Sequence, residues 1–323
     1  MHSVLLTAQP RPELTIYLRA FSAEDPGNWT AMFAQAQAAD AAGVDRLLVS
    51  DHVVFGEKLE EYGRPEIGGI AGGKQPTGPD GHWLEPVTTL AVVAGMTRRI
   101  RLRTQILLAA LRRPVTLAKS AATLDVLSGG RFELGVGVGW QREEYEAAGL
   151  SFEARGRLLD HTLEVCQTLW RNQRASYDSP ELQFDGIHQM PKPLQPGGVP
   201  VWVSGTVRKT TARRLARFGS GWIPWGADIA DLPNAIPRMR EAISAAGGNP
   251  EGLKVAGNLP VVRGANGKMN VEATMAAVPA LVESGITEFS GVFDTPPDRN
   301  GAEETLRHIV QKFRDAVGHP MSD

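Results

Sequence analysis

The sequence predicts a (β/α)8 barrel, and three features support this fold class. Short apolar segments alternate with longer amphipathic segments eight times along the 323 residues. The apolar segments are almost continuously hydrophobic, which is typical of parallel strands covered on both faces. An open doubly wound sheet usually has fewer units and a glycine fingerprint after its first strand, which this chain lacks. We therefore expect a TIM barrel formed as one domain by residues 1–323.

The expected elements follow one another along the whole chain. Strands are expected at 14–20, 46–50, 100–111, 131–139, 199–205, 221–226, 253–262 and 286–293. Helices are expected at 28–43, 85–99, 114–130, 152–170, 207–219, 232–248, 270–285 and 302–318. Pro86 lies in the first turn of the second helix, and glycine ends several of the others. Two segments interrupt the rhythm: a long glycine-rich loop after the second strand, at 56–83, and an irregular insertion before the fifth, at 172–198.

The composition excludes several classes of function. A net charge of −2 without a long basic run argues against nucleic acid as a partner. No apolar stretch approaches the ~20 residues of a membrane span, and the first residues lack the order of a signal peptide, so we expect a cytoplasmic protein. The single cysteine, Cys166, lies in an amphipathic segment and is expected to be a buried structural thiol. The seven histidines show no ligand spacing, so no metal is expected.

Asp51 and His52 directly follow the second expected strand. Because catalytic groups of such barrels lie at the C-terminal ends of the strands, this pair is expected on the active face. A histidine beside a carboxylate can carry a proton near neutral pH. A helix cap or a solvated turn is an equally good interpretation of this pair taken alone.

Three other strand ends carry suggestive residues. Glycines alternate at the end of the fourth strand, either to admit a ligand or to form a tight barrel corner. The turn SGTVRKTT after the fifth strand is typical of an anion site at a helix N-terminus, unless Ser204 or Thr206 simply caps the helix. Trp222 and Trp225 flank Pro224 at the end of the sixth strand and either wall a pocket or belong to the core. The basic residues after the fifth strand could meet a polyanionic tail or form a solvated helix face; they are Arg208, Lys209, Arg213 and Arg214.

Four segments together resemble the luciferase-like monooxygenase family, and most closely its coenzyme F420-dependent oxidoreductase branch. They are VSDHVVF; the long run from EPVTTLAVVAGMTRR through GVGVGWQREEYEAAGL to FEARGRLLD; MPKPLQPGGVPVWVSG; and ARRLARFGSGWIPW. The resemblance covers residues 45–226, whereas the last hundred residues agree only in their strand–helix rhythm. It implies a homodimeric barrel that binds a flavin or deazaflavin over the strand ends.

The resemblance also implies roles for individual residues. Asp51 and His52 match a pair that contacts the ring and relays a proton, and Gln105–Ile106 matches a non-proline cis peptide bond under the ring. The residues that match those lying close to the cofactor or binding its phosphate are Gly137, Gly139, Ser204, Gly205, Thr206 and Val207. Gly56 and Trp140 replace a tryptophan and a glutamate of the sugar-phosphate dehydrogenases in this branch. We therefore expect an apolar or aromatic substrate, in a pocket that includes Trp140 and Trp225.

The expected reaction is hydride transfer between C5 of F420 and a small organic substrate. His52 is expected to relay the proton, while Asp51 orients His52 or hydrogen-bonds the polar edge of the ring. The alternative is a two-component monooxygenase that takes reduced FMN from a separate reductase and reacts with O₂, since one fold serves both chemistries. A binding protein without turnover is a third hypothesis. The loop at 56–83 is expected to be a lid over the substrate, or else a disordered surface insertion.

Overall fold

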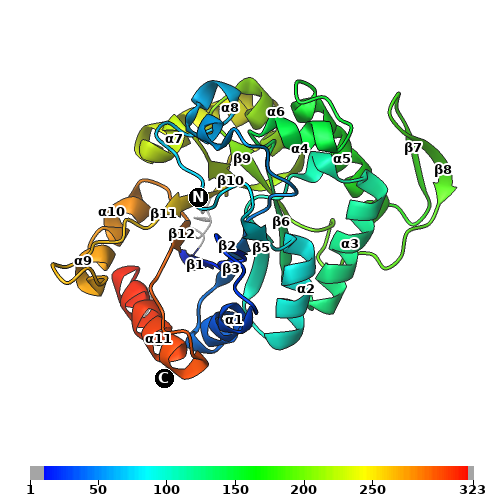
Figure 1. Ribbon diagram of the computed structural model, residues 1–323. Coiled ribbons are helices and arrows are strands. Elements are labelled where there is room, and N and C mark those ends of the chain that lie inside the picture. Colours follow the sequence, from blue (N-terminus) through cyan, green and yellow to red (C-terminus); the bar gives the residue numbers. More distant parts are fainter. Residues whose placement is uncertain (1–10, 319–323) are drawn as a thin grey trace, which may run out of the picture.

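The computed structural model describes residues 11–318, and its centre is a closed barrel of parallel strands (Figure 1). In chain order the barrel strands are β1 (Glu13–Tyr17), β3 (Arg46–Val49), β5 (Arg101–Thr104), β6 (Phe132–Val136), β9 (Val201–Gly205), β10 (Gly219–Pro224), β11 (Lys254–Asn258) and β12 (Glu288–Gly291). Each strand pairs with the next, and β12 returns to pair with β1. The barrel prediction is confirmed, and all C-terminal strand ends meet at one mouth.

Helices surround the barrel (Figure 1). They are α1 (Thr30–Ala42), α2 (Pro86–Met96), α3 (Pro114–Leu127), α4 (Arg142–Ala147), α5 (Arg155–Arg171), α6 (Lys209–Phe218), α7 (Ala227–Ala230), α8 (Leu232–Ala245), α9 (Val271–Met275), α10 (Val278–Glu283) and α11 (Arg299–Ala316). The single helix expected at 270–285 is two helices, because Pro279 at the start of α10 has no N–H to continue α9. Within residues 11–318, no helix combines the length and the apolar character needed to cross a membrane.

The third barrel strand is much shorter than expected. Only Arg101–Thr104 is strand; the chain then passes through a cis peptide bond and ends in the 3₁₀ helix η3 (Ala109–Leu111). Leu107 and Leu108 are nevertheless buried. An apolar run reports burial but does not distinguish a strand from a buried irregular segment, which is why the prediction of a strand to residue 111 was wrong.

Both interruptions contain regular structure. The insertion expected to be irregular carries an antiparallel hairpin, β7 (Ala175–Asp178) and β8 (Gln183–Ile187), which projects from the barrel (Figure 1). The glycine-rich loop contains the 3₁₀ helices η1 (Leu59–Gly63) and η2 (Pro65–Ile67), then β4 (His82–Trp83), which pairs with β2 (Phe21–Ser22). These elements are short and half-exposed, so they lack the hydrophobic period that marks the barrel strands.

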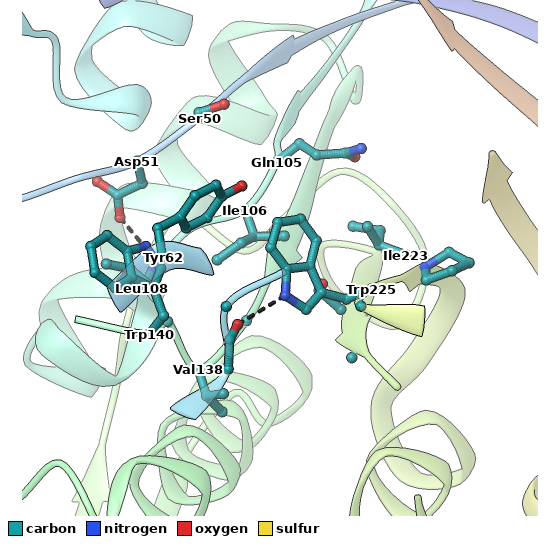
Figure 2. A pocket seen from close by; sticks show the side chains of 18 of the residues that line it. Ser50, Asp51, Tyr62, Gln105, Ile106, Leu108, Val138, Trp140, Ile223 and Trp225 are labelled. Carbon is teal, nitrogen blue, oxygen red and sulfur yellow. Dashed lines mark hydrogen bonds between the residues drawn. The ribbon is translucent and has the colours of Figure 1, made fainter. Parts of the chain in front are cut away.

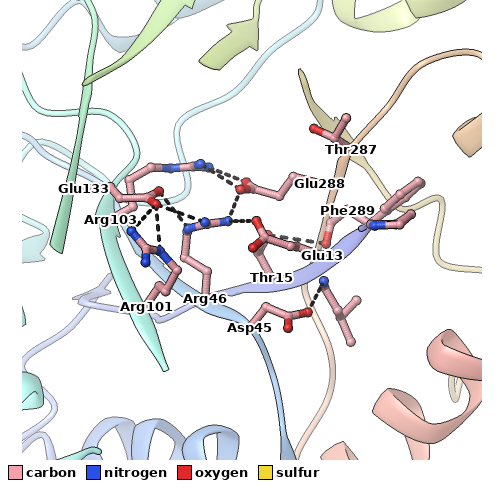
Figure 3. A network of polar contacts seen from close by, with 12 residues as sticks. Glu13, Thr15, Asp45, Arg46, Arg101, Arg103, Glu133, Thr287, Glu288 and Phe289 are labelled. Carbon is pink, nitrogen blue, oxygen red and sulfur yellow. Dashed lines mark hydrogen bonds and ion pairs between the residues drawn. The ribbon is translucent and has the colours of Figure 1, made fainter. Parts of the chain in front are cut away.

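A network of ion pairs occupies the barrel interior beneath the mouth (Figure 3). The Arg46 side chain is fully buried and pairs with Glu13, Glu133 and Glu288. Arg103, also fully buried, pairs with Glu288. The Arg103 guanidinium lies 4.0 Å from the centre of the Trp202 ring. Each buried charge therefore has a partner of opposite sign, as a low-dielectric interior requires.

Candidate active site

A cavity of about 1480 Å³ opens at the barrel mouth. Its wall includes residues from the ends of every barrel strand and from the glycine-rich loop. Eleven residues selected from the sequence line it, namely Asp51, His52, Gln105, Ile106, Gly137, Gly139, Trp140, Ser204, Gly205, Thr206 and Trp225. Of the twelve residues that the resemblance assigned to the cofactor or substrate site, only Val207 does not line the cavity. Residues distant in the sequence thus converge on one site, as expected for a barrel of this kind.

Asp51 does not orient His52 in this structure. Its carboxylate forms a bidentate ion pair with Arg112, in which Oδ2 lies 2.5 Å from Nη1 and Oδ1 lies 3.0 Å from Nη2. Oδ2 also accepts a hydrogen bond from the main-chain N–H of Leu108 at 2.9 Å. Burial raises the pKa of the Asp51 carboxyl, although Arg112 and the Leu108 N–H oppose the shift. Asp51 therefore anchors the segment that follows the cis bond. The expectation that it orients the imidazole is wrong, whereas the alternative, a hydrogen bond to the polar edge of the ring, stays a prediction.

Glu144 on α4 is the partner of His52. Its Oε1 lies 3.3 Å from His52 Nδ1 and accepts the main-chain N–H of Val53 at 2.8 Å. The Glu144 side chain is 1% exposed, and its Oε2 has no hydrogen-bond partner within residues 11–318. With Nδ1 facing this carboxylate, His52 Nε2 is left without a partner in the described chain and available to a ligand. The sequence offered the acid pair Glu143–Glu144 as a signal, but nothing in the pattern linked it to His52.

Aromatic rings enclose the histidine and the cavity. The His52 ring centre lies 4.3 Å from that of Phe55 and 4.9 Å from that of Trp83. Figure 2 shows the rings of Tyr62, Trp140 and Trp225 around the same space. Tyr62 lies 5.4 Å from Trp140 and 6.1 Å from Trp225, measured between ring centres. Such a wall favours a flat or apolar ligand.

Trp222 and Trp225 have different roles. Trp222 is fully buried and donates from Nε1 to the Gly205 carbonyl at 2.8 Å, so it belongs to the core. Trp225 lines the cavity and donates from Nε1 to the Gly68 carbonyl at 2.9 Å. The strand alternates its side chains between inside and outside, but the sequence could not show which tryptophan faced the mouth.

The floor of the cavity contains the cis peptide bond Gln105–Ile106, as the resemblance implies. The glycines at the end of β6 pack against this segment. A Cβ added to Gly137 would lie 2.8 Å from Ile106 Cδ1, and one added to Gly139, at φ +70°, 2.7 Å from Leu108 Cδ2. These glycines therefore make room for the side chains that form the floor.

The turn after β9 leaves a helix N-terminus open to the cavity. α6 begins after Arg208 without a side-chain cap, so neither Ser204 nor Thr206 caps it. The Val207 N–H is not free, because it donates to Asp228 Oδ2 at 2.6 Å. Any anion at this turn would instead be bound by Ser204, Thr206 and the first N–H groups of α6.

Arginines form the wall of the cavity between α5 and α6. Those that line it are Arg155, Arg157, Arg208, Arg213 and Arg214. Arg214 pairs with Asp160 and Arg157 with Glu181, whereas Arg208 and Arg213 have no ion-pair partner within residues 11–318. Lys209, which the sequence grouped with them, does not line the cavity. This part of the wall favours an anionic ligand.

The glycine-rich loop closes one side of the mouth. Besides the bond from Trp225 to Gly68, Arg155 Nη2 donates to the Ile67 carbonyl at 3.2 Å. At the start of the loop, Gly56 N–H donates to Gln141 Oε1 at 2.7 Å. The loop thus forms part of the cavity wall, while its opening and closing remain a prediction. Among residues 11–318 no group of three or more His, Cys, Asp or Glu side chains is placed to hold a metal.

Comparison with known proteins identifies the family. The family model of luciferase-like monooxygenases matches residues 7–314. The chain belongs to this family. An uncharacterized protein of Mycobacterium tuberculosis is 36% identical over 51% of the chain, and the match spans 57% of that relative's length. A phthiodiolone/phenolphthiodiolone dimycocerosates ketoreductase of M. tuberculosis is 28% identical over 70% of this chain and 64% of its own.

Solved structures with the same fold include enzymes of two cofactor types. An F420-dependent secondary alcohol dehydrogenase has a TM-score of 0.71 at 17% identity, covering 94% of this chain and 100% of its own. A type II Baeyer–Villiger monooxygenase of Pseudomonas putida in complex with FMN has a TM-score of 0.70 at 14% identity, covering 96% and 100%. At these identities the likeness shows the luciferase-like barrel and does not choose between the cofactors.

Proposed function

We propose that this luciferase-like protein is an F420-dependent oxidoreductase that acts on a small apolar or aromatic carbonyl compound or the corresponding alcohol. The arginine wall beside the uncapped start of α6 carries the proposal. F420 has carboxylates beyond its phosphate, whereas FMN ends at the phosphate. Arg208 and Arg213 lack ion-pair partners in the described chain and suit those additional charges.

The residues at the mouth also fit a flat ring. Ile106 and Gln105 provide a floor, and Trp140, Tyr62 and Trp225 provide walls. A deazaflavin bound there would supply or accept the hydride, and the aromatic walls would limit the access of water to it. The ketoreductase relative supports a carbonyl substrate, and the aromatic rings around His52 support an apolar one.

His52 is assigned the proton that accompanies the hydride. Glu144 holds Nδ1, so that Nε2 faces the ligand and exchanges the proton with the substrate oxygen. The buried Glu144 carboxylate compensates the positive charge of the protonated imidazole. Asp51 and Arg112 act indirectly, because they fix the main chain next to the floor of the cavity.

Side-by-side fluorescence titrations with F420 and with FMN test the cofactor. We expect the double variant Arg208→Gln/Arg213→Gln to weaken F420 binding by about tenfold or more, with FMN binding much less affected. Arg307→Gln, which removes an exposed arginine of α11 that does not line the cavity, is the matched control. Tight FMN binding with weak F420 binding would instead favour the two-component monooxygenase, which O₂ uptake with reduced FMN would then reveal.

A further inference from the structure

Tyr17 lies at the mouth end of β1 and lines the cavity, yet the proton path through His52 does not use it. Its hydroxyl oxygen lies 2.9 Å from Gln105 Nε2. Gln105 precedes the cis peptide bond, so the phenol lies beside the floor of the cavity. Burial raises the pKa of the Tyr17 phenol, which therefore keeps its proton at neutral pH.

Arg103 determines the direction of the hydrogen bond between Gln105 and Tyr17. A guanidinium group only donates hydrogen bonds. Arg103 Nη2 bonds Gln105 Oε1, so the amide oxygen faces Arg103 and the amide nitrogen faces Tyr17. The phenol oxygen is consequently the acceptor of this bond, and the phenol O–H does not donate to Gln105.

The barrel interior holds this arrangement in place. Arg103 is 0% exposed and lies over the Trp202 ring. It donates from Nη1 to Glu288 Oε2 at 2.8 Å (Figure 3). These contacts orient the guanidinium, and the orientation of the Gln105 amide follows from it. An ionic network deep in the barrel thus sets the polarity of a side chain at the mouth.

Ser290 is a further polar side chain beside the phenol. Its Oγ lies 3.0 Å from the Gly257 carbonyl oxygen and 3.2 Å from Asn258 Oδ1, both of which can take the serine proton. Ser290 therefore retains a lone pair that can accept the phenol proton while the cavity holds no ligand. A ligand with a carbonyl oxygen would compete for that proton.

We propose that Tyr17 donates a hydrogen bond to a carbonyl oxygen of a molecule bound in the cavity, with Gln105 and Arg103 as positioning residues. The carbonyl belongs either to the cofactor ring or to the substrate. The identity of that ligand rests on the proposed function, whereas the direction of the hydrogen bond rests only on the three side chains.

Tyrosine labelled with ¹³C at Cζ reports on each phenol directly by NMR. The protein has four tyrosines, and Tyr17→Phe assigns the signal of interest. Gln105→Glu should move the Tyr17 signal without any ligand, because a carboxylate has no N–H and would turn the phenol into its donor. In the wild type, a shift on adding F420 alone would place the acceptor on the cofactor. A shift only after acetophenone is added would place it on the substrate.

Binding provides the second measurement. Tyr17→Phe and Gln105→Glu should each weaken, by about tenfold, the binding of whichever ligand moves the Tyr17 signal. The first variant has no phenol proton, and in the second the introduced carboxylate accepts it, so neither can offer that proton to the ligand. Tyr177→Phe, which removes a phenol hydroxyl bonded to Glu164 outside the barrel, should leave both binding and the Tyr17 signal unchanged.

A Tyr17 signal that stays in place with F420 bound, both with and without acetophenone, would overturn the inference. The wild-type titration needs only Tyr17→Phe for assignment, so it decides the matter even where Gln105→Glu does not fold. F420 that fails to bind at all would count against the proposed cofactor, which is a different result from bound F420 with an unmoved signal.

Discussion

At the scale of single residues, His52 takes its orientation from Glu144, which lies 92 residues along the chain. The neighbouring Asp51 is directed to Arg112, 61 residues away. Adjacent side chains at a strand end point in different directions, so proximity in sequence is weak support for a catalytic dyad. The arrangement of a histidine and a buried carboxylate that orients it follows the logic of other acid–base sites.

Glu144→Gln tests the role of this carboxylate. We expect turnover to fall about tenfold or more, because the neutral amide cannot compensate a protonated His52, while F420 affinity is retained. His52→Ala should cut turnover further, again with affinity spared. Initial rates under saturating F420 measure the effect, and Glu146→Gln, an exposed acid on the same helix, is the control. Wild-type turnover in Glu144→Gln would remove Glu144 from the proton path.

At the scale of elements, the glycine-rich loop is held over the mouth by a few specific bonds. Trp225 and Arg155 both bind main-chain carbonyls of its central turn. The loop buries few apolar side chains of its own, and η1 and η2 contain no buried residue. An element that depends on so few contacts is expected to open more easily than the barrel beneath it.

Trp225→Phe tests whether the loop opens independently. The variant keeps an aromatic ring but loses the bond from Nε1 to the Gly68 carbonyl. Loss of this hydrogen bond should lower the free energy of opening the loop by about 1 kcal/mol. Amide hydrogen exchange in residues 56–83 should then be about fivefold faster, while exchange in the barrel strands should be unchanged. Trp170→Phe removes the same kind of bond, to the Ala118 carbonyl, in the shell of the barrel, and should not affect the loop. Equal exchange in Trp225→Phe and wild type would show that this bond does not hold the loop.

At the scale of the whole molecule, the ion pairs inside the barrel join strands from both halves of the chain. Glu133 on β6 faces Arg46 and Arg101, and Glu288 on β12 faces Arg46 and Arg103 (Figure 3). Burial alone would raise the pKa of the Glu133 carboxyl, but the surrounding arginines and Lys254 lower it from 4.5 to about 2. Removing one partner of such a network leaves another charge buried and uncompensated.

The pKa of Glu133 predicts how stability depends on pH. Because it is lower in the folded protein, the stabilisation is fully present above pH 4.5 and is lost as the pH falls toward 2. This shift in pKa corresponds to a contribution of about 3 kcal/mol to the free energy of unfolding. Urea unfolding at a series of pH values should show this loss in the wild type. Glu133→Gln should be destabilised by a similar amount at pH 7, and its free energy of unfolding should fall less steeply between pH 4.5 and pH 2. An unchanged pH dependence in Glu133→Gln would contradict the assignment.

The barrel, and the end of it that carries the site, could both be predicted from the sequence. This was possible because strand and helix periods are local properties, and because parallel strands place their C-terminal ends together. The strand pattern also placed Asp51 and His52 at that mouth, and the family resemblance placed Trp140 and the segment around Gln105 there.

Which of these side chains face one another could not be predicted from the sequence and is seen only in the folded barrel. The pairing of His52 with Glu144, the Arg103–Gln105–Tyr17 chain and the closure of the loop by Trp225 all join segments that are distant in sequence. Side-chain direction at a strand end depends on the exact register and on where regular backbone stops. Both are set by packing across the whole barrel and leave no periodic signal in the chain.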